Sequence, residues 1–225
     1  MRKEGWIYLF DGKSFEGWGF TRNREAWSID DGAILCATRR HGGGGYLYTL
    51  KQYDNFILSV DFKFERGANS GVFIRVSNLN DRRKRKGEPP PIVNSGLEIQ
   101  ILDDYGEPPS KHSCGAIYDL VAPIKNTVKP AGEWNNFIIT CRDNIITVDL
   151  NGERITEMDV DKWDKPGLNP VGTRNKFKYA WKYMPRKGHI ALQNHGPRKG
   201  YTQAKVWFKN IKLKPIDRLM HRGED

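Results

Sequence analysis

Residues 95–103 (SGLEIQILD) combine strand-like alternation with side chains that could take part in chemistry. Successive side chains of a strand point to opposite faces of a sheet, so the leucine and two isoleucines at its centre share one face. Glu98 and Gln100 share the other face. A carboxylate beside an amide, backed by an apolar row, predicts the floor of a site for a polar ligand.

Two further segments have the same alternation and offer polar side chains of their own. In residues 72–76 (VFIRV), Arg75 falls on the face opposite the valines and the isoleucine. In residues 190–195 (IALQNH), Gln193 and His195 share a polar face. A single outward polar residue on a strand is usually only solvated. If the three strands belong to one sheet, however, their polar rows converge, and the sequence predicts a hydrogen-bonding platform there.

Strands must position these residues, because strand patterns recur along the chain and amphipathic helix patterns are scarce. The expected strands are residues 27–30, 33–36, 46–49, 56–64, 71–76, 97–102, 136–141, 145–150, 188–194 and 204–213. Asp-Gly and Asn-Gly pairs at 31–32 and 151–152 are typical of tight hairpin turns. The pattern predicts an all-β fold, a two-sheet antiparallel sandwich of jelly-roll type.

The length of 225 residues suits one domain spanning 1–225, with long loops inserted at about 80–95 and 161–188. No apolar run approaches the roughly 20 residues that a membrane span requires. The first residues, MRKEGW, lack the apolar stretch of a secretory signal. The sequence as given therefore predicts a soluble chain. Whether a signal peptide has been trimmed from it is left open.

Net charge and cysteine content do not by themselves indicate a class of binding protein or enzyme. The net charge is +10, and much of the excess lies in residues 81–86 and 176–187. Such runs are more often solvated loops than surfaces for an anionic polymer, although both interpretations remain open. Cys36, Cys114 and Cys141 lack metal-ligand spacing, so we expect buried free thiols and not a catalytic thiol.

A series of motifs, in order along the chain, resembles one known family. They are LFDGKSFEGW (9–18), NSGVFIR (69–75), GLEIQILD (96–103), GAIY (115–118), VKPAGEWN (128–135), VDLNG (148–152) and GHIALQNHG (188–196). Together they cover about residues 6–213 and resemble the 3-keto-disaccharide hydrolase family, formerly a domain of unknown function.

The resemblance implies a concanavalin A-like (laminin-G-like) jelly roll that acts on glycosides oxidised to a ketone at C3. It implies a carbohydrate partner, an oxidised di- or oligosaccharide, and no nucleic acid. Many relatives are exported by bacteria that degrade polysaccharides, so the expected location is periplasmic or secreted, with a cytoplasmic one open. The insertion at 161–188 is longer and more basic than the family pattern.

The chemistry of such a substrate fits the polar strand better than ordinary glycoside hydrolysis does. Two-acid hydrolysis needs carboxylates about 5–5.5 Å or roughly 6.5–9.5 Å apart. Here Gln100 cannot ionise. Asp103 is five residues from Glu98, an odd number, so on a regular strand the two side chains point to opposite faces. A 3-keto sugar needs only one base, because the ketone acidifies the C2 proton. Elimination of the C1 substituent and hydration of the double bond then complete the cleavage.

We therefore assign roles by hypothesis. Glu98 or His195 is the base or acid, and Arg75 stabilises the enolate. The substrate-binding candidates are Gln100, Gln193, Tyr118, Asp103 and Lys129. Asp103 is also a candidate to hold a cation. A divalent cation is compatible with these residue types, but no spacing identifies a metal site, and no cofactor is assigned.

The alternative interpretation is a non-catalytic carbohydrate-binding module of a polysaccharide-degrading system. Sugars bind aromatic platforms flanked by hydrogen-bonding groups. Four aromatic residues of the 161–188 insertion are candidates for such platforms: Trp163, Tyr179, Trp181 and Tyr183. They could equally pack the insertion against the sandwich.

Overall fold

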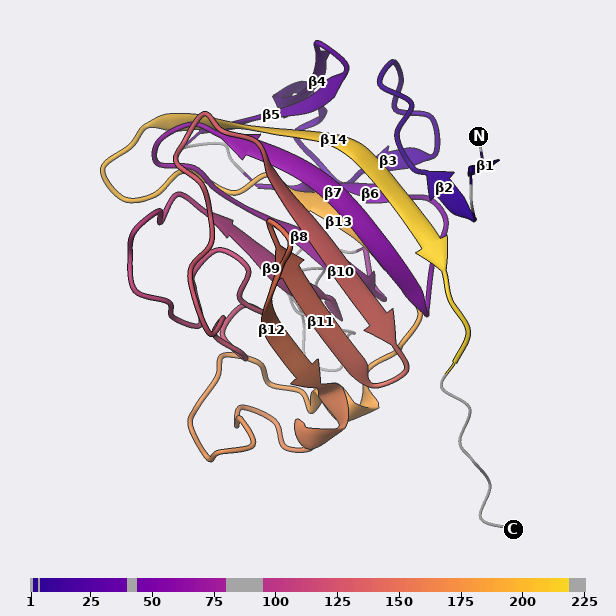
Figure 1. The fold of residues 1–225 in the computed structure, drawn as a ribbon, viewed down its shortest axis with the longest axis vertical. Coiled ribbons are helices and arrows are strands. Elements are labelled where there is room, and N and C mark those ends of the chain that lie inside the picture. The colour runs from indigo at the N-terminus through magenta and orange to yellow at the C-terminus, as the bar shows by residue number, and fades with distance from the viewer. Residues whose placement is uncertain (1, 4, 40–43, 80–94, 219–225) are drawn as a thin grey trace.

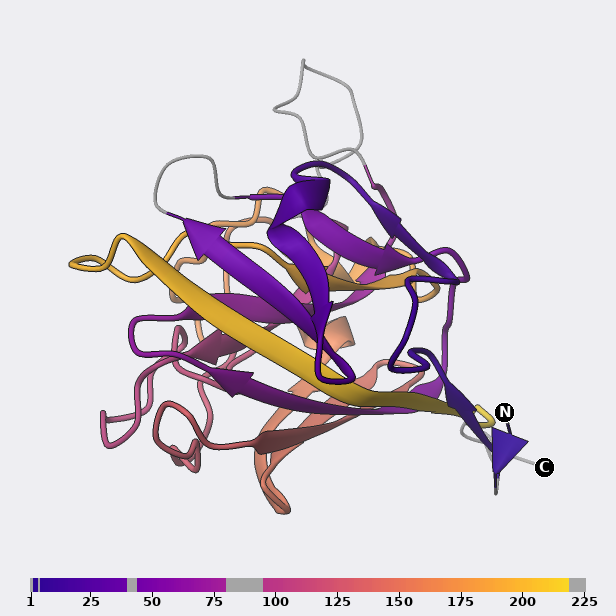
Figure 2. The same ribbon diagram turned by 90° about the horizontal axis from the view of Figure 1, so that it is seen from above.

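The computed structural model describes residues 2–3, 5–39, 44–79 and 95–218. These residues form two antiparallel sheets, one of nine strands and one of five, packed face to face (Figures 1 and 2). We call them the large sheet and the small sheet. The predicted all-β sandwich is confirmed. The expected loop at 80–95 and the basic run at 81–86 lie outside the described residues, apart from Ser95.

The large sheet has the order β1-β2-β14-β7-β10-β11-β12, with β5 pairing with β14 and β4 pairing with β5. Its strands are β1 (Arg2–Lys3), β2 (Trp6–Tyr8), β4 (Trp27–Asp30), β5 (Ala33–Arg39), β7 (Phe56–Phe64), β10 (Asn135–Arg142), β11 (Ile145–Leu150), β12 (Glu153–Asp159) and β14 (Gln203–Pro215). The long strand β14 lies beside β7 at its centre (Figure 1).

The small sheet carries the residues of interest. Its order is β3-β6-β13-β8-β9. The strands are β3 (Trp18–Phe20), β6 (Tyr46–Thr49), β8 (Asn69–Val76), β9 (Leu97–Leu102) and β13 (His189–Gln193). Thus β13, β8 and β9 are neighbours, as the convergence of polar rows requires. Short 3-10 helices η1 (Arg24–Ala26), η2 (Val160–Lys162) and η3 (Trp181–Tyr183) lie in the connections.

The main core fills the space between the sheets, because each strand turns alternate aliphatic or aromatic residues inward. Phe62 and Phe137 pack there with tilted rings whose centroids are 4.6 Å apart. The outer face of the small sheet is also partly apolar, with a second buried cluster of Tyr46, Phe73 and Ala191 at its centre. The polar residues of β9 and β13 therefore stand beside buried rings rather than in open water.

Turn chemistry explains the hairpins of the large sheet. Asp31, Asp143 and Asn151 have φ of 46°, 49° and 54°, the left-handed conformation that Asn and Asp tolerate in tight turns. Strand β12 was not predicted, since its sequence ERITEMD is dominated by polar residues. It is an edge strand, and only its inward residues need to be apolar.

All three cysteines are buried free thiols, as expected. Burial raises the pKa of each thiol, which keeps it protonated and unreactive. Within the described part of the chain, no helix has both the length and the apolar character needed to cross a membrane.

Candidate functional site

The site centres on Glu98, on the outer face of the small sheet. Phe73 of β8 lies directly across from Glu98, and Gly71 lies across from Gln100. A Cβ added at Gly71 would come within 2.7 Å of Glu98 Oε1, so the carboxylate lies over that glycine. From there it hydrogen-bonds the side-chain amide of Gln193 on β13. The absence of a side chain at Gly71 thus lets Glu98 reach across β8.

The environment makes Glu98 a carboxyl group that titrates near neutrality. The residue is only 7 % exposed, and the ring of Phe73 borders it. Burial disfavours the charged form and raises the pKa of Glu98 from 4.5 to about 7. Two smaller effects oppose burial, the positive charge of Lys176 and the hydrogen bond from Gln193. A group of this kind can accept and return a proton at physiological pH.

Residues 115–118 extend the small sheet and place Tyr118 beside Glu98. Gly115 N donates to Gln100 O over 2.9 Å, and Tyr118 N donates to Glu98 O over 2.9 Å. An isolated bridge joins Ile99 to Ile117. By antiparallel alternation, Tyr118 therefore shares the outer face with Glu98. Burial first, and then the negative charge of Glu98, raise the pKa of the Tyr118 hydroxyl, which stays a neutral donor.

A lysine from the inserted loop completes the cluster. The ammonium of Lys176 lies 4.1 Å from the centroid of the Tyr118 ring, a cation–π geometry. Desolvation lowers the pKa of Lys176, and the charges of Glu98 and Asp119 oppose that shift. The residue remains exposed on one side. The base and a cation thus face the same space from two different segments.

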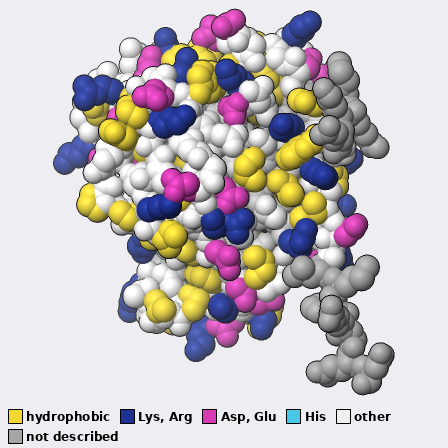
Figure 3. All heavy atoms as spheres, in the orientation of Figure 1, with side chains coloured by type: hydrophobic (Ala, Val, Ile, Leu, Met, Phe, Trp, Pro, Cys, Tyr) yellow, Lys and Arg dark blue, Asp and Glu magenta, His cyan; other side chains and the backbone are white. Residues whose placement is uncertain are grey.

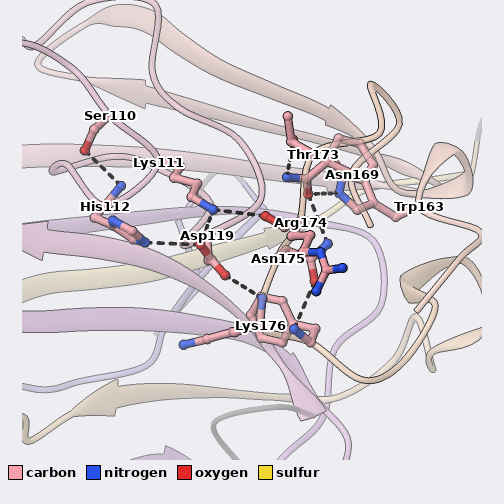
Figure 4. Close-up of polar contacts among 11 residues, drawn as sticks. Ser110, Lys111, His112, Asp119, Trp163, Asn169, Thr173, Arg174, Asn175 and Lys176 are labelled. Carbon is pink, nitrogen blue, oxygen red and sulfur yellow. Dashed lines mark hydrogen bonds and ion pairs between the residues drawn. The ribbon is translucent and has the colours of Figure 1, made fainter. Parts of the chain in front are cut away.

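Asp119 holds this arrangement together (Figure 4). Its carboxylate accepts hydrogen bonds from Lys111 Nζ at 2.6 Å, from His112 Nε2 at 3.1 Å and from the Lys176 backbone N–H at 2.6 Å. These bonds fasten the inserted loop to the segment that carries Tyr118. Although burial opposes it, the combined hydrogen bonds and the Lys111 charge lower the pKa of Asp119, which stays ionised.

Gln100 and Gln193 each have a side-chain oxygen that accepts no hydrogen bond among the described residues. Gln100 is 2 % exposed and donates to Asn69 Oδ1 over 3.0 Å. A buried polar atom without a partner is costly. These oxygens are suited to accept hydrogen bonds from a ligand that carries many hydroxyls.

Arg75 does not lie on this face, and the alternation that placed it there is wrong. Its φ of 55° is left-handed, and the pairing of β8 with β13 shifts register between His189 and Ala191. This bulge turns the Arg75 side chain toward the large sheet, where Nη2 donates to Asp143 O over 2.6 Å. Arg75 is therefore not placed to stabilise an enolate beside Glu98.

Three other predicted residues make hydrogen bonds to groups other than Glu98. His195 follows the end of β13, is exposed, and its Nδ1 lies 2.7 Å from Gly196 O. Asp103 lies past β9, and its Oδ2 accepts a hydrogen bond from Gly67 N over 2.7 Å. Lys129 is exposed, and its Nζ donates to Trp134 O over 3.1 Å. The structure brings together Glu98, Gln193 and Tyr118, with Gln100 next to them.

Two of the four candidate aromatic residues of the insertion are buried and stabilise the insertion itself. Trp163 and Trp181 are 8 % and 3 % exposed. Trp163 Nε1 donates to Asn169 Oδ1 over 3.0 Å, and Trp181 packs edge-on against Phe177. Tyr183 is 75 % exposed and Tyr179 is partly exposed, so these two remain candidates for a platform.

Sequence reasoning missed three residues of the site, namely Lys176, Asp119 and His112. The motif that includes residues 115–118 pointed to this segment, but Asp119 follows it directly. Lys176 was visible only as part of a basic run. No group of three or more His, Cys, Asp or Glu side chains in the described ranges is close enough to hold a metal ion. The divalent cation considered above remains a prediction.

Comparison with known proteins identifies the family of the chain. The sequence pattern of the 3-keto-alpha-glucoside-1,2-lyase-like domain matches residues 5–214. The chain belongs to this family. Within the match lie Glu98, Gln193, Tyr118 and Lys176, so the lyase-like domain contains the whole site.

Relatives of this lyase-like domain include a Bacteroides thetaiotaomicron protein named 3-keto-disaccharide hydrolase. It is 28 % identical over 239 residues, covering 95 % of this chain and 79 % of the relative. A Parabacteroides distasonis protein proposed to be a glycosyl hydrolase has a crystal structure with 33 % identity and a TM-score of 0.76, covering 94 % of this chain and 99 % of that one. A Bacillus subtilis protein with a galectin-like fold aligns at a TM-score of 0.58 and 15 % identity, covering 97 % of this chain and all of that one, and supports the fold alone.

Proposed function

We propose that this protein cleaves the glycosidic bond of 3-keto-glycosides by elimination and hydration. The observation that carries the proposal is Glu98, a buried carboxyl group whose pKa of about 7 suits a base that works near neutral pH. Membership of the lyase-like family, and a relative named 3-keto-disaccharide hydrolase, support the substrate class.

The reaction begins with proton abstraction. Glu98 removes the proton from C2, and the electron pair of that bond moves into the C3 ketone to form an enolate. Collapse of the enolate forms a C1–C2 double bond and expels the substituent on C1. Water then adds at C1, and C2 regains a proton from Glu98 after that carboxyl group has exchanged its proton with solvent. The products are a 3-keto sugar and the released aglycone.

Neighbouring side chains are placed to lower the barrier. Stabilising a developing oxyanion is usually the largest single contribution to catalysis. Lys176 is the cation best placed to stabilise the enolate oxygen, because its positive charge acts on Glu98 and its ammonium lies over the Tyr118 ring. The neutral hydroxyl of Tyr118 is a donor for the departing oxygen. Gln100 and Gln193 accept hydrogen bonds from sugar hydroxyls.

The decisive experiment compares a 3-keto disaccharide with the same disaccharide unoxidised. We expect free monosaccharide only from the oxidised compound. In deuterated water, elimination and hydration place deuterium at C2 of the product, whereas direct hydrolysis leaves C2 unlabelled. Release of sugar without label would overturn the mechanism and leave a hydrolase.

Variants separate catalysis from binding. Glu98→Gln keeps the size and hydrogen-bonding shape of the side chain but cannot take a proton. Glu133→Gln, an exposed position in a loop, is the matched control. Turnover by Glu98→Gln at the wild-type rate would remove Glu98 from the mechanism. Binding of the disaccharide without release of monosaccharide by the wild-type protein would instead indicate a carbohydrate-binding module.

A further inference from the structure

A second groove lies at the end of the sandwich, apart from Glu98. It has a volume of about 470 Å³ and is lined by the β7–β8 turn, the segment after β9, the approach to β10 and the β13–β14 connection. Asp103, on its wall, is five residues beyond Glu98 along a strand direction, or about 16 Å. The β7–β8 turn and the β13–β14 connection lie together at the left of Figure 1. This groove is separate from the site around Glu98 described above.

The groove is firmly built around Gly67. A Cβ added at this glycine would come within 2.2 Å of the Tyr201 ring, so the ring lies directly on the backbone there. The φ of Gly67 is 76°, which also favours glycine. Arg198 N donates to Gly67 O over 2.8 Å. The Tyr201 ring is thereby held in place before any ligand arrives.

Two tyrosine side chains are exposed on the groove. Tyr105 is 60 % exposed and Tyr201 is 39 % exposed. Aromatic rings with a polar tip are favoured where one face meets an apolar surface and the edge meets water. The C–H face of a pyranose ring offers such a surface, and its hydroxyls match the polar lining.

The charges of the groove are not balanced. Glu107 is paired with Arg198 at 3.0 Å, and Asp103 Oδ2 is engaged by Gly67 N. Arg66 and Lys199 are exposed on the lining, and neither makes an ion pair within the described part of the chain. The lining holds three cations and two carboxylates, so it carries a net charge of +1 beside the two tyrosines, and Arg66 and Lys199 are its cations without an ion pair among the described residues.

We propose that this groove binds a carboxylate-bearing pyranose, such as a uronic acid residue of an acidic polysaccharide. The tyrosines contact the ring, and Arg66 and Lys199 bind the carboxylate. Guanidinium groups recognise carboxylates in a planar, two-bond geometry, which gives Arg66 the directional role. The site does not depend on the chemistry at Glu98.

The surface beyond the groove favours a longer acidic chain. On the outer face of the large sheet, Lys63 lies 5.0 Å from the ring of Trp134, and Lys209 lies 3.9 Å from the same ring. Lys63 is three residues before Arg66, and the two acidic residues Asp61 and Glu65 lie beside it along this part of the chain. Figure 3 views this face and shows Lys and Arg side chains distributed among hydrophobic and acidic ones. A polymer seated in the groove can extend across it.

The test is calorimetric titration of the whole protein with a galacturonic acid trisaccharide, and with the neutral galactose trisaccharide for comparison. We expect binding of the acidic sugar and little of the neutral one. The double variant Arg66→Ala/Lys199→Ala should weaken binding about fivefold, the loss typical of two exposed charge contacts. Tyr105→Ala should weaken it by a similar factor, because the ring contact is lost. Lys13→Ala/Lys165→Ala, which removes two exposed charges elsewhere, should leave it unchanged.

Several results would overturn the proposal. Equal weakening by both double variants would mean that only net charge matters. Equal binding of duplex DNA, with the same loss in Arg66→Ala/Lys199→Ala, would indicate a general polyanion surface. No binding of the acidic trisaccharide at millimolar concentration would exclude the site. Because Tyr105 is exposed and the charge variants are on the surface, unfolding is not expected, and a thermal melt of each variant checks this.

Discussion

Replacement of Glu98 by Gln should lower activity and raise stability in the same protein. The carboxylate lies on a face bordered by Phe73, and its ionised form is held there at a cost. A glutamine has nearly the same shape and can still hydrogen-bond Gln193, but it carries no charge at any pH. The substitution therefore removes both the proposed base and the penalty of burying its charge.

The size of the stability change follows from the pKa. Folding raises the pKa of Glu98 from 4.5 to about 7, which corresponds to about 3 kcal/mol. Between these two values the folded protein holds a proton that the unfolded chain has lost. Wild-type stability therefore falls as pH rises from about 4.5 to 7, and the full penalty is present above 7. Glu98→Gln avoids it, so the variant should gain up to about 3 kcal/mol at pH 8 and little at pH 4.

Urea unfolding of both proteins across pH 4–8 measures this difference. All other titrating groups are shared, so subtraction isolates Glu98. Activity on a 3-keto disaccharide should fall about 10²–10⁴-fold in the variant. In the wild type, kcat/KM should rise about tenfold per pH unit below 7 and level off above it, following the fraction of ionised Glu98.

Two outcomes would refute the reasoning. A stability difference that does not change with pH would show that Glu98 titrates normally and is not desolvated. A gain in stability at high pH without loss of activity would show that Glu98 is buried but not catalytic. The control Glu133→Gln should change neither quantity, because that carboxylate is exposed.

Three further substitutions test the neighbours of Glu98. Lys176→Met removes the charge that lowers the pKa of Glu98, so the acidic limb of the kcat/KM profile should move to higher pH; an unmoved limb would separate Lys176 from the base. Gly71→Ala places a Cβ 2.7 Å from Glu98 Oε1 and should displace the carboxylate, with a loss of about 10²-fold in kcat measured on the 3-keto disaccharide; normal turnover would contradict the geometry. Arg75→Met removes the hydrogen bond from Arg75 Nη2 to Asp143 O and should lower the free energy of unfolding in urea by about 1 kcal/mol, while kcat/KM stays unchanged; a selective loss of activity would return Arg75 to the site.

Alternation predicted much of the architecture because a period of two describes any regular strand. Residues 97–102 and 145–150 form strands with the expected bounds, and β13, β8 and β9 meet as the polar rows required. Alternation failed at Arg75, because a single left-handed residue reverses the faces that follow it. The local sequence VFIRV does not predict that bulge. His195 lies two residues past the end of β13, so strand alternation does not fix the direction of its side chain.

Local pattern and residue type were enough to predict the sandwich, the family resemblance and Glu98 as the central group. The groups that surround that carboxylate depend instead on tertiary contacts. Lys176 acts on it from 78 residues away along the chain, and Asp119, 21 residues away, holds the Lys176 backbone, through contacts that no periodicity encodes. The pKa of Glu98 was likewise decided by folding, since desolvation depends on Phe73 and on the segments packed over it.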